Sequence, residues 1–251
     1  MEAACAPYQY ALSTRAGTEC VAHMLRAWLQ KDPRNTLLSL DGIGAYDTMR
    51  RCAMLEKLAT LPEASAMLPF VLYSYGQSSE YLWYDDTGEA HTVRQGEGGE
   101  QGDPLMPALY ALGQHAALEA LAAEFLPTEK LCAFLDDVYI VCKPERLRHL
   151  YSRAEHHLYE KTGVRLNMGK TKVFNHGGAK PRGVEELQKP RPDAERVWVG
   201  DHTLPEEERG VLVLGSPVGT LAYAESCGRS KVDQEQQLLE PLPLLPDLQC
   251  A

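Results

Sequence analysis

The sequence predicts an α+β fold, in which an antiparallel sheet of about three or four strands is backed by two helices. Residues 18–31 place apolar side chains at helical spacing, and residues 104–125 form a long Ala- and Leu-rich stretch. Two pairs of short apolar runs, within 81–94 and 131–142, each enclose a polar turn and indicate β-hairpins. The 251 residues suffice for one large domain or two small ones.

The first third of the chain alternates between helical and strand patterns. The helix expected over 18–31 ends at the Asp-Pro-Arg-Asn run of residues 32–35. The short apolar run at 36–40 predicts a buried strand. Helical patterns follow over 48–61 and 62–75.

The middle of the chain holds the two predicted hairpins and the longest predicted helix. In the first hairpin, runs 81–84 and 90–94 flank an Asp-Asp-Thr-Gly turn. A Gly-rich polar loop over 95–103 leads into the helix expected over 104–125, which has Pro104 near its first turn. The second hairpin follows this helix.

After the second hairpin, an amphipathic pattern predicts a helix over 144–162. Residues 176–196 are rich in Gly, Pro and charge, and we expect an exposed loop there. Residues 223–251 are acidic and end in a Pro- and Leu-rich run. Short strands are expected at 165–166, 171–174, 197–199 and 211–214.

The composition is ordinary for a globular chain and argues against several classes of protein. Hydrophobic residues make up 44% and charged residues 24%. No stretch approaches the ~20 apolar residues of a membrane span, and the N-terminus lacks a secretory pattern. The seven cysteines include no C-x-x-C pair, which argues against a disulfide framework or a zinc site. We therefore expect an intracellular protein without a membrane partner, with nucleus or cytoplasm left open.

The net charge of −10 opposes nucleic-acid binding, since phosphate backbones attract Lys and Arg. The acidity is unevenly distributed, however. Residues 184–251 contain 13 acidic and 6 basic residues, so most of the net negative charge lies in the last quarter of the chain. The objection is therefore weaker for the first 183 residues.

Three carboxylates stand at the ends of predicted strands. Asp41 follows the first strand, and Asp136 and Asp137 lie at the bend of the second hairpin. Neighbouring strands can bring them together, and clustered carboxylates repel one another unless a cation binds them. Mg²⁺ prefers such oxygen ligands, and two ions ~3.5–4 Å apart promote phosphoryl transfer. The alternative for Asp136 and Asp137 is a simple polar turn, as expected for Asp85 and Asp86.

Five segments resemble, in order, the motifs of reverse transcriptases, especially those of the LINE-like, non-LTR retrotransposon type. A weaker match to the family's last fingers segment covers residues 8–19. Five motifs in the family's order are far more specific than any one of them. The five segments are 40–47, 94–107, 134–137, 163–172 and 213–217.

The resemblance implies a catalytic and metal-binding role for Asp41, Asp136 and Asp137, with two Mg²⁺ ions or Mn²⁺ as a substitute. It implies that Tyr46 is the steric gate that disfavours a ribose 2′-hydroxyl. The alternative for Tyr46 is a packed core aromatic. Lys170 or Lys172 would lie near the triphosphate, and the sequence does not choose between them.

The remaining implied contacts involve the nucleic acids and the incoming nucleotide. Gln101, Gly102 and Pro104 would contact nucleotide and template. Leu214 and Gly215 would belong to the primer grip.

The chain also departs from the family pattern. Met106 stands where the family usually has Ser, and Leu135 where it usually has a small residue. The resemblance further implies a chain truncated at both ends, without the basic fingers segment and with little or no thumb. We therefore expect a palm with partial fingers over 1–222, and a tail or start of a thumb over 223–251.

The implied function is RNA-directed DNA polymerase, a nucleotidyltransferase that joins a dNTP to a primer 3′-hydroxyl opposite an RNA template. The fingers and thumb segments that the chain lacks would be needed as partners, and the oligomeric state stays open. The alternative is a catalytically inactive retroelement remnant that acts at most as a nucleic-acid-binding or interaction module. The intact carboxylates favour the enzyme, whereas the two short ends favour the remnant.

Overall fold

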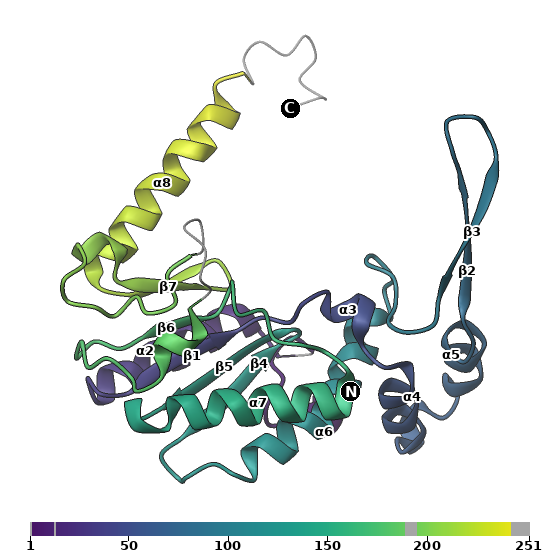
Figure 1. Ribbon diagram of the computed structural model, residues 1–251, viewed down its shortest axis with the longest axis horizontal. Coiled ribbons are helices and arrows are strands. Elements are labelled where there is room, and N and C mark those ends of the chain that lie inside the picture. The colour runs from purple at the N-terminus through teal and green to yellow at the C-terminus, as the bar shows by residue number, and fades with distance from the viewer. Residues whose placement is uncertain (1, 13, 189–194, 242–251) are drawn as a thin grey trace.

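A four-stranded antiparallel sheet lies at the centre of the computed structural model, which describes residues 2–12, 14–188 and 195–241 (Figure 1). The two middle strands, β5 and β1, are almost fully buried, as expected for short apolar runs covered on both faces. In spatial order the strands are β4 (Lys130–Phe134), β5 (Asp137–Cys142), β1 (Thr36–Leu40) and β6 (Lys172–Phe174).

Two helices, α6 (Met106–Ala122) and α7 (Leu147–Thr162), cover one face of this sheet, as the sequence predicted. Leu38 and Ile140 of the sheet share a fully buried cluster with Leu118 of α6 and Leu150 of α7. Figure 1 shows both helices lying along the same side of the strands. The α+β class is thereby confirmed.

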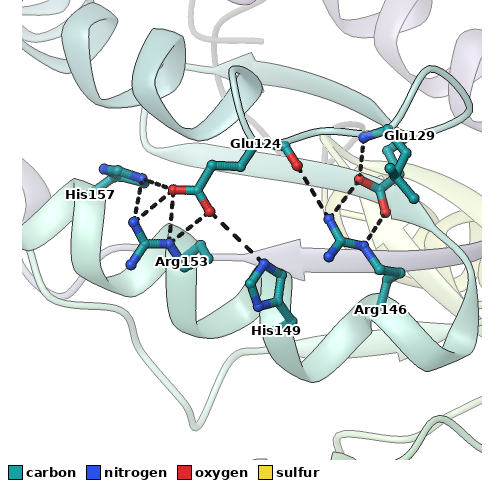
Figure 2. Close-up of polar contacts among 7 residues, drawn as sticks. Glu124, Glu129, Arg146, His149, Arg153 and His157 are labelled. Carbon is teal, nitrogen blue, oxygen red and sulfur yellow. Dashed lines mark hydrogen bonds and ion pairs between the residues drawn. The ribbon is translucent and has the colours of Figure 1, made fainter.

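Ion pairs fasten α7 to the connection between α6 and β4 (Figure 2). Glu124, just after α6, receives bonds of 2.6–2.8 Å from the Arg153 guanidinium and lies 2.7 Å from His157 Nε2. The same connection includes Glu129, whose side chain is only 2% exposed and pairs with Arg146 at 2.8 Å. These contacts hold η2 (Pro144–Arg146) and α7 against the α6–β4 connection.

The opposite face is covered by α2 (Gly17–Lys31) and by a second, two-stranded sheet. Because side chains alternate along a strand, Leu37 faces α2 while Leu38 faces α6 and α7. The small sheet pairs β7 (Gly210–Val213) with β8 (Ser216–Gly219), and its buried valines complete this second core.

A third cluster packs the segment between β1 and α6 against α6 itself, with Cys5 and Val164 added from elsewhere in the chain. It is built around Met49, Met54 and Val71, which are fully buried. An exposed hairpin extends from it, as Figure 1 shows. The elements are α3 (Ala45–Thr48), α4 (Arg51–Ala59), η1 (Pro62–Ala64), α5 (Leu68–Tyr75), β2 (Ser79–Tyr84) and β3 (Ala90–Gln95).

The helix α8 (Leu221–Leu239) projects from the small sheet away from the rest of the molecule (Figure 1). It begins at Thr220, whose hydroxyl accepts a 3.1 Å hydrogen bond from the Tyr223 amide, as an N-cap does. Within the described ranges, no helix combines the length and the apolar character needed to cross a membrane. The short remaining helices are α1 (Glu2–Cys5), η2 (Pro144–Arg146), η3 (Val184–Leu187) and η4 (Glu206–Glu208).

Two predicted strands were wrong. At 165–166 only Leu166 forms a single bridge, to Gly42, and at 197–199 only Trp198 does so, to Val173. These segments touch the sheet for one residue and then turn away, so no ladder forms. The predicted loop 176–196 contains η3. Residues 189–194 of that loop and 242–251 of the predicted tail lie outside the described residues.

Candidate active site

Asp41 lies directly after β1, where the central sheet ends. Its side chain is 19% exposed, and its Oδ1 atom is 3.2 Å from the ammonium nitrogen of Lys170. Its backbone carbonyl accepts a 2.8 Å bond from the Asn167 amide. These contacts from the chain after α7 fix the carboxylate at the sheet edge.

The β4–β5 turn brings the other two carboxylates to the same edge. Leu40 pairs with Val138 in the β1–β5 ladder, so the next positions, Asp41 and Asp137, adjoin each other where the ladder ends. Leu135 begins the turn with φ of +53°, a left-handed conformation that is costly for a branched side chain. Contacts outside the turn must therefore hold Leu135 in a backbone conformation that leucine disfavours.

Burial and neighbouring charge perturb two of the three carboxylates. Burial, together with the negative charges of Asp136 and Asp41, raises the pKa of Asp137 to about 6. Burial and the charge of Asp41 also raise the pKa of Asp136. Partly desolvated carboxylates that repel one another suit a divalent cation with a preference for oxygen ligands. The donor set therefore fits Mg²⁺ or Mn²⁺.

Two cavities open beside these carboxylates. One, of about 440 Å³, is lined by Asp41, Asp137 and Lys170, and Leu214 also borders it. The other, of about 550 Å³, is lined by Asp136 together with the loop before α6. The adjacent aspartates at the turn thus line different cavities: Asp137 lines the first and Asp136 the second.

The second cavity gathers the residues expected near a nucleotide. Tyr46 of α3 lines it together with Gln101, Gly102 and Pro104. The Tyr46 ring packs edge-on against Tyr110 with centroids 5.1 Å apart, so one side of the ring is supported by the core. Burial and the charge of Asp136 raise the pKa of the Tyr46 hydroxyl.

The Gly-rich loop that carries Gln101 is tied to the segment around α3. The Gly98 amide donates to the Met49 carbonyl at 2.7 Å, and the Gly99 amide donates to the Tyr46 carbonyl at 3.0 Å. Gly98 has φ of +68°, and a Cβ there would overlap backbone atoms of Tyr46 and Asp47. Glycine is required at this position because the two backbones approach so closely.

The structure separates the two candidate lysines. Lys170 contacts Asp41, whereas the ammonium of Lys172 lies 2.7 Å from Glu195 and donates to the Arg196 carbonyl at 3.0 Å. Both lysines line the 440 Å³ cavity, but only Lys170 of the two contacts a carboxylate of the triad.

Leu214 and Gly215 form the turn between β7 and β8, with φ of +48° and +79°. Leu214 lines the same cavity as Asp41 and Asp137. The turn expected to contact a primer therefore lies beside two of the three carboxylates.

The structure adds two residues to which the sequence assigned no role. Asn167 bonds the Asp41 backbone, and its side-chain amide lies 3.5 Å from Asp41 Oδ2. Arg51 is 5% exposed and donates to the carbonyls of Gly98 and Gln77, so it fastens the Gly-rich loop to α4. A buried arginine has no sequence signal, because nothing in the pattern shows that its partners are distant carbonyls.

A second acidic group lies on the exposed hairpin. The ligand atoms of Asp85, Glu89 and His91 lie within 4.8 Å of one another. Asp85 Oδ1 already accepts from the Thr87 and Glu89 amides at 2.9 and 3.0 Å, and its other oxygen contacts His91 at 2.8 Å. Turn formation explains this group, as the sequence predicted for Asp85.

A sheet backed by two helices, with carboxylates at one edge between two cavities, defines the palm of a template-directed polymerase. Residues 4–218 match the reverse transcriptase (RNA-dependent DNA polymerase) family, so the chain belongs to that family. The predicted family and fold class are both confirmed.

One relative comes from a mobile element. The chain is 30% identical over 174 residues to the retrotransposable element SLACS 132 kDa protein of Trypanosoma brucei gambiense. The match covers 68% of this chain but only 14% of that protein. The chain therefore spans about a seventh of the relative's length.

Solved telomerase structures share the fold. The telomerase of Candida albicans, in complex with a telomeric RNA fragment, superposes with a TM-score of 0.53 at 16% identity, over 72% of this chain and 34% of that one. The corresponding complex from Candida tropicalis gives 0.52 at 15% identity, over 65% and 30%. At these identities the similarity shows the fold.

Proposed function

We propose that this chain catalyses nucleotidyl transfer, joining a dNTP to the 3′-hydroxyl of a DNA primer opposite an RNA template. The observation that carries the proposal is the convergence of Asp41, Asp136 and Asp137 at one sheet edge, where mutual charge and burial raise the pKa of two of them. A mere polar turn would not require a third carboxylate from another strand.

Asp41, Asp136 and Asp137 would hold two Mg²⁺ ions, for which Mn²⁺ could substitute. When bound, such ions lower the pKa of an attacking hydroxyl and stabilise a leaving pyrophosphate. The protein's contribution is to keep the carboxylates converged and partly dry. Lys170, beside Asp41, would add a positive charge for the triphosphate.

The 550 Å³ cavity would receive the base and sugar of the dNTP. Tyr46, supported from behind by Tyr110, would exclude a ribose 2′-hydroxyl. Gln101, Gly102 and Pro104 line the same cavity and would contact nucleotide and template.

The 440 Å³ cavity would receive the primer end, with Leu214 and Gly215 as the primer grip. We assign residues 1–222 to the palm and partial fingers. The projecting helix α8 lies within 223–251 for nearly all of its length and would begin a thumb. Under this assignment the protein's partners are an RNA template, a DNA primer and dNTPs.

Primer extension tests the proposal. The purified chain is incubated with a DNA primer annealed to RNA, the four dNTPs, and Mg²⁺ or Mn²⁺. We expect metal-dependent extension that the double variant Asp136→Ala/Asp137→Ala abolishes. The matched control is Asp85→Ala/Asp86→Ala, which removes the same charge from the exposed hairpin and should extend normally.

Equal extension by the native chain and by the Asp136/Asp137 variant would overturn the site. If neither extends a primer although both fold cooperatively, this chain alone is not a polymerase, which is the outcome expected of an inactive remnant.

A further inference from the structure

A buried glutamine contacts the turn that presents Asp136 and Asp137. Gln9 is 7% exposed, and its Oε1 atom accepts a 2.7 Å hydrogen bond from the Leu135 amide. Its Nε2 atom donates to the Leu135 carbonyl at 3.3 Å. One side-chain amide thus engages both backbone groups of the residue before Asp136.

Leu135 is the residue that needs such support. Its φ of +53° lies in the left-handed region, and a leucine there is strained unless surrounding contacts enforce the conformation. Glycine would adopt this angle freely. The two hydrogen bonds from Gln9 hold Leu135 in this conformation, which its own sequence disfavours. We call this pair of bonds the clamp.

Gln9 is itself held in place on both sides. Its backbone neighbours bond to β4, because the Tyr10 amide donates to the Ala133 carbonyl at 2.9 Å and the Ala133 amide donates to the Tyr8 carbonyl at 2.7 Å. Its side-chain Nε2 also donates to Gln114 Oε1 of α6 at 3.1 Å, which fixes the amide orientation. Gln9 is therefore held beside the turn by bonds to both β4 and α6.

The same chain of contacts reaches the nucleotide cavity. Gln114 Nε2 lies 3.4 Å from the Tyr110 hydroxyl, and the Tyr110 ring supports Tyr46. A displacement of Gln9 would thus disturb both the turn before Asp136 and the proposed steric gate, Tyr46.

We infer that Gln9 is a positioning residue: its amide locks Leu135 and so sets where Asp136 and Asp137 stand. The inference rests on the proposed polymerase function for its catalytic consequence, but the clamp itself does not. Misplacing a catalytic group by about 1 Å can reduce a rate about 100-fold, so a modest shift of the turn matters.

The test compares three near-isosteric apolar replacements. Gln9→Met removes the clamp, and Gln114→Met removes only its outer support. Asn175→Leu removes another buried amide, which bonds Thr36 and Ala179 outside the carboxylate site and serves as a matched control for lost stability. Melting temperature, amide hydrogen exchange and primer extension are measured for each.

We expect the Leu135 amide of Gln9→Met to exchange at least about threefold faster relative to Ile140, since it loses its acceptor. Extension at saturating dNTP should fall roughly 10- to 100-fold, with a higher Mg²⁺ requirement. Gln114→Met should shift both quantities in the same direction by less. Asn175→Leu should lower the melting temperature by an amount comparable to Gln9→Met. It should leave the relative Leu135 exchange rate and the extension rate unchanged.

Unchanged Leu135 exchange in Gln9→Met and Gln114→Met would overturn the clamp, as would an equal loss of extension in Asn175→Leu. If Gln9→Met does not fold, the Leu135 exchange of Gln114→Met decides. If the native chain extends no primer but Leu135 exchange responds as expected, the polymerase proposal fails while the clamp stands.

Discussion

At the residue scale, Lys170 and Lys172 differ in their partners although they lie in one short motif. The Lys170 side chain contacts Asp41 and is 65% exposed. The Lys172 side chain is only 22% exposed and pairs with Glu195. A cation that serves a triphosphate must reach the carboxylate site. We therefore propose Lys170 for that position.

We predict that Lys170→Met lowers the rate of extension on the order of 100-fold, the scale for loss of one charge-stabilising donor. Lys172→Met should change it by less than about threefold, because the ion pair it loses contributes under ~1 kcal/mol. Single-turnover kinetics with saturating dNTP measures both. The reverse order of effects would move the role to Lys172.

Tyr46 is the second residue whose role can be measured by itself. We predict that Tyr46→Ala increases the relative kcat/KM for rNTPs over dNTPs by roughly 10- to 100-fold, because a filled steric pocket discriminates on that scale. Tyr84→Ala, which removes an exposed tyrosine from the hairpin of β2 and β3, is the control. An unchanged ratio in Tyr46→Ala would leave Tyr46 as a core aromatic.

At the scale of elements, the Gly-rich loop depends on its close approach to α3. Gly98→Ala introduces both a left-handed alanine and an overlap with the backbone of Tyr46 and Asp47. Gly88→Ala introduces only the left-handed alanine, since open space surrounds that position. The pair separates conformational strain from steric overlap.

We predict that Gly88→Ala costs about 1 kcal/mol in the free energy of unfolding or less, the cost of the backbone conformation alone. Gly98→Ala should cost more, about 2 kcal/mol or above, and should weaken dNTP binding through the displaced loop. Urea titration and the KM for dNTP measure these effects. Equal costs would mean that the loop accommodates a side chain by moving freely.

The contact between α7 and the α6–β4 connection gives a pH-dependent prediction (Figure 2). Hydrogen bonds from Arg153, then from His157, lower the pKa of Glu124 from its usual 4.5 to about 2. Because the folded-state pKa is depressed, the stabilisation is fully present above pH 4.5 and is lost as the pH falls toward 2.

We therefore predict that Glu124→Gln lowers the free energy of unfolding by about 1 kcal/mol at pH 6, a value reduced for partial solvent exposure. The difference from the native chain should shrink between pH 4.5 and the lowest pH at which the chain stays folded. Glu185→Gln, in an exposed pair with Lys180, should show little effect at either pH. A constant deficit across this range would mean that charge is not the cause.

At the scale of the whole molecule, local patterns were enough to predict α2, α4 to α7, the two hairpins and the strand before Asp41, but they did not predict the 19-residue helix α8. They could not show where α2 packs or that β7 and β8 form a separate sheet, because those facts depend on contacts between distant segments. The proximity of Asp41, Asp136 and Asp137 was predictable because each carboxylate adjoins an end of a short apolar run. Gln9 was not, since its partner Leu135 lies 126 residues away.

Two choices between similar residues could be made only from the three-dimensional structure. Lys170 and Lys172 occupy one segment, and nothing local indicates which contacts Asp41. Two acidic groups were visible, at Asp85 and at Asp136, and both form hairpin turns. Only the second receives a further carboxylate from a neighbouring strand.

The most direct measurement of the central claim is an anomalous difference map of manganese in crystals of the chain with primer–template and dNTP. We predict Mn²⁺ peaks among Asp41, Asp136 and Asp137, beside the nucleotide phosphates. Manganese at Asp85, Glu89 and His91, with none among Asp41, Asp136 and Asp137, would contradict the account.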